Sequence, residues 1–543
     1  MILVPQPKKC VLTGGESQAL PEHAQECLVS DLPPEGYRLT ISVQAIRLEA
    51  SSAAGFFYGR QTLLQCEAQR DEAGLVCVEI EDTPAFPERG YMLDISRCRV
   101  PTMETLKRLI DLLSQFKYNQ LQLYTEHTFA YVGHEQVWAE SSPLTPEDIQ
   151  QLDAYAEDRF IELVPNQNSF GHFERWLKHP EYQHYAECPD GFIHPISGVR
   201  KDVGSTLCPT QASLDLIRDL YAQLLPNFSS TKFNVGCDEP WELGQGRTAQ
   251  LYPSKLRAEL FFGFLEKIAA EVGDSGREMY FWADAALEHP EHLHQLPQQA
   301  CAVIWGYEAD HPFDRQCGQL RDAGIPFVLG PGDSTWLSFT GRYALAEQNI
   351  PAAAQAAQRY GARGLLLTHW GDQGHAQPWP TLLPSLVLGG AHFWQPQESE
   401  VLVADALDRF VFQDRSATLG SWLCELGRLD ARLGTARFNR SLLYGLLRDS
   451  PFPNDLQEAR ESIDFDQLDN EINRFNANLE RAQPSCDDAQ TLLAECRFII
   501  DLLRTASGGL VAGVSTELKC SYEERWLTRY RSGGLAESLQ GFH

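Results

Sequence analysis

Eight short apolar runs that alternate with amphipathic helical stretches constrain the fold of this chain most strongly. They occupy residues 91–95, 120–124, 161–165, 232–235, 279–282, 302–305, 326–329 and 364–368. Alternating strands and helices are typical of parallel sheets, because a parallel connection needs a crossover. Eight such units, in a segment somewhat longer than the typical length of about 250 residues, predict a closed (β/α)8 TIM barrel. A doubly wound open sheet is the alternative, but no G-x-G-x-x-G motif follows the first run.

The segments on either side of these eight runs have different patterns. Residues 37–43 and 45–50 alternate like strands, and residues 55–65 have helical spacing. The C-terminal part has no convincing strand, and it has helical apolar spacing at 402–412, 419–433, 438–447, 456–481 and 489–505. We therefore predict an α/β domain at 1–85, a barrel at 86–395 and an α-helical appendage at 396–543. The appendage is expected either to pack on the barrel or to mediate a homodimer.

Composition argues against several classes of partner. The net charge of −29 disfavours nucleic acid and anionic membranes as main partners. No stretch approaches the length of a transmembrane helix, and no secretory signal is visible at the N-terminus. The fourteen cysteines are scattered singly, without a C-x-x-C pair or metal-like spacing with histidine. We therefore expect reduced thiols, a cytoplasmic location, and neither a metal nor another cofactor.

Polar and aromatic residues follow most of the eight runs at the point where each run ends. The carboxyl ends of barrel strands share one rim, where barrel enzymes build their active sites. Loops are polar in general, so any single residue carries little information, whereas a full ring of them indicates a site. The ring consists of Asp94, Arg97, Glu126, His127, Asn166, Asn168, His172, Asp238, Glu239, Asp284, Tyr307, Glu308, Asp333, Trp336, Trp370 and Asp372.

Two adjacent carboxylates, Asp238 and Glu239, end the fourth run in Lys232-Phe233-Asn234-Val235-Gly236-Cys237-Asp238-Glu239. Adjacent acids cannot share one environment, so their pKa values are expected to separate, leaving one a proton donor and the other an anion. This octapeptide alone fits a solvated turn equally well. The ring of polar residues around it favours catalysis.

Tryptophans at or just past the predicted strand ends indicate what the site binds. Flat aromatic faces suit the C–H faces of pyranose rings, while acids and amides bind the hydroxyls. One such tryptophan would ordinarily be a core residue, but five near one rim favour a sugar site. They are Trp241, Trp282, Trp305, Trp336 and Trp370.

Arg97 and His172 each have two interpretations. The Arg97 guanidinium can hold two neighbouring sugar hydroxyls, or it can pair with Asp94 or Glu126 and order the loop. His172 either tunes a neighbouring acid or is structural.

The motifs taken together resemble glycoside hydrolase family 20, the β-N-acetylhexosaminidases. The resemblance rests on the segment Arg89-Gly90-Tyr91-Met92-Leu93-Asp94-Ile95-Ser96-Arg97, the Gly171-His172 turn, Asn234-Val235-Gly236-Cys237-Asp238-Glu239, and Trp370-Gly371-Asp372. It extends from about residue 37 to 395. The Asp-Glu pair that follows a glycine is its most specific element.

The resemblance implies exo-acting, retaining, substrate-assisted removal of terminal β-linked N-acetylglucosamine or N-acetylgalactosamine from a small glycan. Glu239 is then the general acid and base, and Asp238 holds the N–H group of the 2-acetamido substituent, whose carbonyl oxygen is the nucleophile. The substrate-binding residues expected from this resemblance, including candidate replacements where the sequence departs from the family, are Arg97, Glu126, His172, Trp282, Trp305, Tyr307, Trp336, Trp370 and Asp372.

Two segments depart from the family pattern. The usual His-x-x-Asp segment is replaced around Thr125-Glu126-His127, so Glu126 or His127 takes the place of the acid. The usual Trp-Tyr-x-Asp segment is Thr335-Trp336-Leu337-Ser338, which lacks the tyrosine and the acid, and Tyr307 is a candidate replacement. A catalytically silent carbohydrate-binding barrel is therefore one alternative. A hydrolase of another sugar, with Glu239 and a distant carboxylate nucleophile, is a second.

Overall fold

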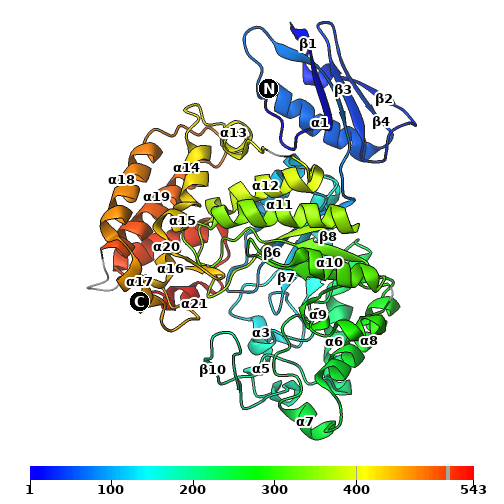
Figure 1. Cartoon of the computed structure of the whole chain (residues 1–543), viewed down its shortest axis with the longest axis vertical. Coiled ribbons are helices and arrows are strands. Elements are labelled where there is room, and N and C mark those ends of the chain that lie inside the picture. Colours follow the sequence, from blue (N-terminus) through cyan, green and yellow to red (C-terminus); the bar gives the residue numbers. More distant parts are fainter. Residues whose placement is uncertain (298, 399, 509–513) are drawn as a thin grey trace.

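Three parts follow one another along the chain in the computed structural model, which describes residues 1–543 except 298, 399 and 509–513 (Figure 1). A small sheet with one long helix comes first, a closed barrel follows, and a group of helices comes last. The barrel and the C-terminal helices share one continuous hydrophobic core, whereas the N-terminal sheet has its own core. Among the described residues, no helix is long and apolar enough to cross a bilayer.

The N-terminal part is a five-stranded sheet in the order β1-β5-β3-β4-β2, covered by one helix. Residues predicted as strands lie in β3 and β4, and the predicted helix lies in α1. Close packing of α1 on the sheet depends on Gly59, where an added Cβ would lie 2.4 Å from Leu48. The elements are β1 (Lys9–Ser17), β2 (Gln25–Leu28), β3 (Tyr37–Ile41), β4 (Ile46–Ala50), α1 (Ala53–Glu67) and β5 (Leu75–Asp82).

The predicted barrel is confirmed: eight strands form a closed sheet, with β15 paired in parallel to β6. Each strand overlaps one of the eight apolar runs. The strands are β6 (Glu88–Asp94), β7 (Gln120–Thr125), β8 (Glu162–Gln167), β11 (Lys232–Asn234), β12 (Glu278–Trp282), β13 (Cys301–Trp305), β14 (Phe327–Gly330) and β15 (Gly364–His369).

Amphipathic helices surround the barrel, as in α2, whose leucines face the strands and whose N-terminus is capped by Thr102. The long outer helices are α2 (Met103–Gln115), α4 (Pro146–Glu157), α6 (Gln211–Leu224), α8 (Arg257–Asp274), α10 (Phe313–Asp322), α11 (Tyr343–Tyr360) and α12 (Leu383–Trp394). Shorter elements occupy the loops at the carboxyl ends of the strands, namely α3 (Glu135–Trp138), α5 (Glu174–Leu177), β9 (Phe192–Ile193), β10 (Arg200–Lys201), α7 (Arg247–Leu251) and α9 (Asp284–Leu287).

The C-terminal region packs on the barrel, which is one of the two roles expected for it. Thr102 and Arg531 donate backbone hydrogen bonds to Arg529 and Val100, at 3.0 and 2.8 Å. Its helices are α13 (Val403–Ala406), the π-helix η6 (Leu407–Phe412), α14 (Leu419–Leu426), α15 (Leu429–Leu433), α16 (Leu442–Gly445), α17 (Asp455–Ser462), α18 (Phe465–Leu479), α19 (Ala489–Ser507), α20 (Thr516–Arg529) and α21 (Leu535–Gln540).

One expectation for this region was wrong. Residues 438–447 were predicted to be helical, but a short hairpin of β16 (Ala436–Arg437) and β17 (Arg440–Ser441) precedes α16. Asn439 has a φ of +61° in the turn between these strands. Asparagine tolerates this left-handed conformation, which interrupts a helix, so the turn overrides the local apolar spacing.

A buried ion pair joins the N-terminal sheet to the barrel. Lys117 Nζ lies 3.0 Å from Asp82 Oδ2, and both side chains are at most 1% exposed. The Tyr37 hydroxyl and the Trp394 indole N–H also donate to the Asp82 carboxylate, at 2.7 and 2.9 Å. Two backbone N–H groups donate as well, at 3.2 and 3.0 Å, so the carboxylate is stabilised by one cation and four neutral donors.

We expect Lys117→Met to lower the free energy of unfolding by about 3–5 kcal/mol, because it leaves Asp82 buried without a counter-charge. Arg359→Met is a matched control, since its ion pair with Asp314 has both side chains 56% exposed and should contribute less than about 1 kcal/mol. Urea denaturation followed by circular dichroism measures both variants. Equal, small shifts would contradict the structural role assigned to the buried pair.

Candidate active site

Asp238 and Glu239 lie just past the carboxyl end of β11, in a sharply turned segment. Gly236, Cys237 and Glu239 have φ values of +69°, +69° and +50°. A Cβ at Gly236 would lie 2.6 Å from the Asn168 side chain, so this position requires glycine. Non-glycine residues with positive φ are uncommon and concentrate at functional sites. The turn presents two successive carboxylates to one pocket.

Asp238 is buried and held as an anion. Asn168 donates to its Oδ1 at 2.7 Å, and His172 Nε2 lies 3.1 Å from its Oδ2. Burial by itself raises the pKa of Asp238, but the His172 charge and the hydrogen bonds outweigh that effect and lower the pKa below its usual value.

The pKa of Glu239 is shifted in the opposite direction. Burial, assisted by the negative charges of Asp238 and Asp372, raises the pKa of Glu239 despite the contact of its Oε2 with His172 Nε2 at 3.4 Å. Beneath it, the Glu239 backbone N–H donates to Asp284 Oδ2 at 3.0 Å. Burial and the two neighbouring carboxylates raise the pKa of Asp284 to about 8. The site therefore combines one carboxyl group whose pKa is lowered with two whose pKa values are raised.

His172 lies between the two carboxylates. Burial lowers the pKa of His172, but the Asp238 carboxylate and the hydrogen bonds raise it well above its usual value. Among the residues that the structure describes, His172, Asp238 and Glu239 form the one cluster with ligand atoms close enough for a metal ion. Arg97 Nη2 lies 3.5 Å from the other ring nitrogen, Nδ1, so His172 lies between one cation and two carboxylates.

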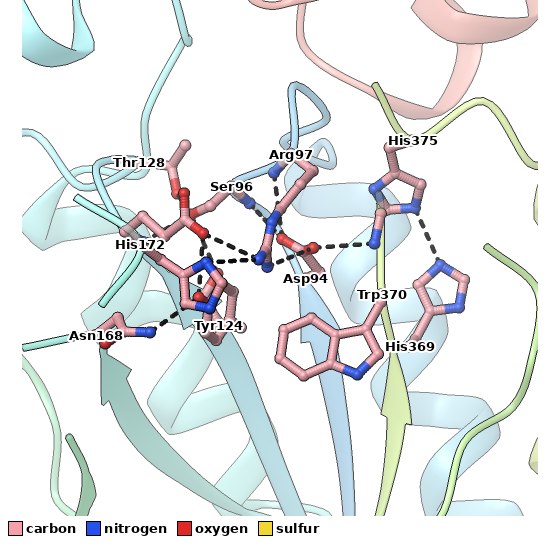
Figure 2. Close-up of polar contacts among 12 residues, drawn as sticks. Asp94, Ser96, Arg97, Tyr124, Thr128, Asn168, His172, His369, Trp370 and His375 are labelled. Atoms are coloured by element: carbon pink, nitrogen blue, oxygen red, sulfur yellow. Dashed lines mark hydrogen bonds and ion pairs between the residues drawn. The ribbon is translucent and has the colours of Figure 1, made fainter. Parts of the chain in front are cut away.

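Arg97, at the end of the first barrel strand, is fixed by ion pairs and aromatic rings (Figure 2). Its Nη1 lies 3.0 Å from Asp94 Oδ2, and its Nη2 lies 3.3 Å from Glu126 Oε1. The guanidinium carbon lies 4.7 and 5.1 Å from the ring centres of Tyr124 and Trp370. Arg97 therefore makes the ion pairs considered from the sequence, and it still lines the pocket.

Several aromatic rings line the same pocket as Arg97. Trp305 stacks on Tyr307 with ring centres 5.3 Å apart, and Trp336 meets Tyr307 edge to face at 4.9 Å. The Trp370 indole N–H donates to the Tyr307 hydroxyl oxygen at 2.7 Å. The Tyr307 hydroxyl thus accepts a hydrogen bond from Trp370 and keeps a proton that it can itself donate.

Most of the residues predicted for the site lie around this one pocket. Glu126 and Trp282 do not line it. Glu126 lies behind Arg97, and Trp282 is fully buried, with its ring centre 5.7 Å from that of Trp370. Asn439 lines the pocket but was not predicted. The predicted residues that line it are Arg97, His172, Asp238, Glu239, Trp305, Tyr307, Trp336, Trp370 and Asp372.

Comparisons with known proteins agree with this geometry. The sequence profile of the glycosyl hydrolase family 20 catalytic domain matches residues 86–380, and that of domain 2 of the same family matches residues 4–83. A beta-hexosaminidase of Akkermansia muciniphila is 26% identical over 62% of this chain and 71% of its own length. A beta-hexosaminidase of Porphyromonas gingivalis is 31% identical over 38% of this chain, but over only 29% of its own length.

Solved structures resemble the fold. One structure, of a beta-N-acetylhexosaminidase, has a TM-score of 0.62 and 19% identity, covering 79% of this chain and 96% of that one. A chitobiase of Flavobacterium johnsoniae has a TM-score of 0.60 and 15% identity over 99% of this chain and 98% of its own. At these identities the likeness bears on the fold alone.

Proposed function

Because the chain belongs to glycosyl hydrolase family 20, we propose that it is an exo-acting β-N-acetylhexosaminidase. Its substrate would be a small glycan or glycoside that ends in β-linked N-acetylglucosamine or N-acetylgalactosamine. One observation carries the proposal: adjacent carboxyl groups in one aromatic pocket have pKa values shifted in opposite directions, with Asp238 lowered and Glu239 raised. Substrate-assisted cleavage needs one anion and one acid at this spacing.

Glu239 is the proposed general acid. Its raised pKa keeps the proton on the carboxyl group until it is transferred to the glycosidic oxygen as the bond to the anomeric carbon breaks. The resulting carboxylate then takes a proton from the water that attacks the anomeric carbon. Burial in an aromatic pocket is the physical cause of the raised pKa.

Asp238 is the proposed partner of the 2-acetamido group. Its carboxylate accepts the acetamido N–H, so that the acetamido carbonyl oxygen points at the anomeric carbon and forms the new C–O bond. A nucleophile held in this way acts with an effective molarity of about 10⁵–10⁸ M. The fixed negative charge of Asp238 stabilises the oxazolinium cation that forms. Water then opens this ring from the same face as the departed group, so configuration is retained.

The remaining pocket residues are proposed to bind the sugar. Arg97 and Asp372 would bind hydroxyl groups, and the hydroxyl proton of Tyr307 would be donated to the acetamido carbonyl oxygen. The rings of Trp305, Trp336 and Trp370 would cover the pyranose and the acetamido methyl group. Glu126 would act through Arg97, and His172 through Asp238 and Glu239. Trp282 would support Trp370 from below.

Hydrolysis of 4-nitrophenyl β-glycosides tests this function. We expect cleavage of the N-acetylglucosaminide or the N-acetylgalactosaminide but not of the glucoside, because glucose has no acetamido nucleophile. N-Acetylglucosamine thiazoline, a mimic of the oxazolinium ion, should inhibit cleavage. Cleavage of the glucoside that the thiazoline leaves unchanged would instead indicate a carboxylate nucleophile in the protein. Binding of the thiazoline without cleavage of any substrate would favour the catalytically silent barrel.

A cytoplasmic location and a homodimer remain proposals. The first rests on cysteine usage, since all fourteen cysteines are free thiols. The second rests on the helical C-terminal region, whose outer surface is available for association once its inner surface has packed on the barrel. Size-exclusion chromatography with light scattering measures the oligomeric state.

A further inference from the structure

The hairpin β16–β17 brings a residue of the C-terminal helical region into the pocket of the barrel. Ala436 pairs with Ser441 and Arg437 pairs with Arg440, which leaves Phe438 and Asn439 as a two-residue turn. Asn439 lines the same pocket as Glu239 and Trp336. The barrel strands alone therefore do not complete this pocket.

The turn is attached to two loops of the barrel. The Asn439 side-chain oxygen accepts from the Trp336 indole N–H at 2.9 Å. Its backbone N–H donates to Glu308 Oε1 at 2.9 Å. The Ser441 backbone N–H donates to the Leu337 carbonyl at 3.0 Å. Three hydrogen bonds thus fix Asn439 relative to the loops that follow β13 and β14.

The base of the hairpin is also fixed, from the side of the C-terminal helices. Arg440 forms a two-pronged ion pair with Asp455, at 2.7 and 2.9 Å, and the Asp455 side chain is only 2% exposed. Groups preorganised in this way bind ligands with little loss of conformational entropy. The neighbouring pair of Arg437 with Glu458, at 2.6 Å, is more exposed and contributes little to this fixation.

The side-chain amide of Asn439 uses its oxygen in a hydrogen bond and leaves its nitrogen available to donate. Because an indole N–H can only donate, the atom facing Trp336 must be the oxygen, and the other atom is the nitrogen with two N–H donors. Among the residues that the structure describes, this nitrogen donates no hydrogen bond, whereas the oxygen and the backbone N–H of Asn439 are both engaged. The Ser338 hydroxyl of the neighbouring loop is buried and hydrogen-bonded to Thr340 and Gly341, and Ser338 does not line the pocket.

We propose that Asn439 is a specificity-determining residue whose side-chain N–H donates to a hydroxyl oxygen of the bound sugar. The proposal rests on the proposed function, because it takes the occupant of the pocket to be an N-acetylhexosamine. It also assigns a role to the C-terminal region, which supplies this donor to the barrel. The hydroxyl that accepts the bond is expected to set part of the preference between sugars.

Two substitutions separate the N–H donor from the rest of the residue. Asn439→Asp keeps an oxygen for Trp336 and tolerates the positive φ, but it has no N–H to donate. Asn439→Gly keeps the backbone conformation and removes the side chain. Arg437→Ala is the matched control, because Arg437 lies in the same hairpin and its side chain pairs with Glu458 outside the pocket.

The variants are assayed with 4-nitrophenyl β-N-acetylglucosaminide and with its 3-, 4- and 6-deoxy analogues. We expect both Asn439 variants to raise KM for the parent substrate by about 3- to 10-fold, the effect of one lost hydrogen bond, with a smaller change in kcat. One deoxy analogue lacks the hydroxyl oxygen that accepts from Asn439, and for this analogue the wild type and both Asn439 variants should have equal KM values. Arg437→Ala should behave like wild type on every substrate.

An unchanged KM in both Asn439 variants overturns the proposal. So does an equal loss on the parent and on all deoxy analogues, which would mean that the substitutions only displace Trp336. If the wild-type protein cleaves no acetamido sugar, the proposed function fails separately. Calorimetric titration of the same variants with N-acetylglucosamine and its deoxy forms then tests Asn439 without catalysis, and equal affinities for all variants would again overturn the proposal.

Discussion

Replacing Glu239 by glutamine should lower kcat for 4-nitrophenyl β-N-acetylglucosaminide by about 10²- to 10⁴-fold, the usual contribution of a general acid and base. Glutamine has nearly the same shape but neither donates an acidic proton to the leaving group nor accepts one from water. KM should change much less, since the side chain remains in place. Steady-state kinetics with the purified variant measure both constants. Turnover within a few-fold of wild type would remove Glu239 from its assigned role.

The leaving group offers a sharper test of the same role. 2,4-Dinitrophenolate departs with little protonation. Glu239→Gln should therefore slow the first step far less for a 2,4-dinitrophenyl glycoside than for a 4-methoxyphenyl glycoside. Glu242→Gln is the matched control: Glu242 is a buried carboxylate three residues further on, bonded to the Ser205 backbone at 2.9 Å. The Glu242→Gln variant should have a changed stability, but its rate should depend on the leaving group as that of the wild type does.

The pH dependence follows from the same residue. The raised pKa of Glu239 extends its protonated form to higher pH than an exposed glutamate would allow. Activity should therefore persist above the usual pKa of glutamate and then fall as the pH rises through the raised value and the proton is lost. In Glu239→Gln this basic limb should disappear from the profile of kcat/KM.

Local sequence patterns were sufficient to predict the barrel. Each strand is a short apolar run, most of the runs are followed by polar or aromatic residues, and the closed topology brings the ends of all eight strands to one rim. Asp238, Glu239 and Trp370 follow directly from this placement, because each stands within a few residues of a strand end. The expected separation of carboxyl pKa values also needed only the adjacency of two acids.

Depth below the rim could not be predicted from the same patterns. Trp282 and Trp305 are both the last residues of their strands, yet one is fully buried and the other lines the pocket. Which of the two contacts a ligand depends on whether another side chain lies between it and the pocket, as Trp370 does for Trp282. The role of Asn439 could not be predicted for another reason. Its region is distant in sequence from the other pocket residues, and the helical apolar spacing there predicted a helix in place of the turn.

Replacing Asp238 by alanine or asparagine should produce the second large effect, a fall in kcat of about 10²- to 10³-fold or more. Asparagine keeps the size of the side chain and an oxygen for the Asn168 donor, but it carries no charge. If Asp238 acts through its charge, the two variants should be impaired to a similar extent. If its only role were to fill space, asparagine would retain most of the activity.

The thiazoline inhibitor tells charge stabilisation apart from general damage to the pocket. Its bicyclic ring resembles the oxazolinium ion, and its nitrogen can take up a proton and the positive charge beside Asp238. Its affinity should therefore fall in parallel with kcat in both Asp238 variants, while N-acetylglucosamine should bind with a smaller loss. The pKa of His172 should fall as well, because the Asp238 carboxylate is the chief group that raises it. NMR titration of His172 in the two variants would measure this shift. Equal losses of affinity for the thiazoline and the neutral sugar, with His172 unchanged, would mean that Asp238 shapes the pocket without stabilising the cation.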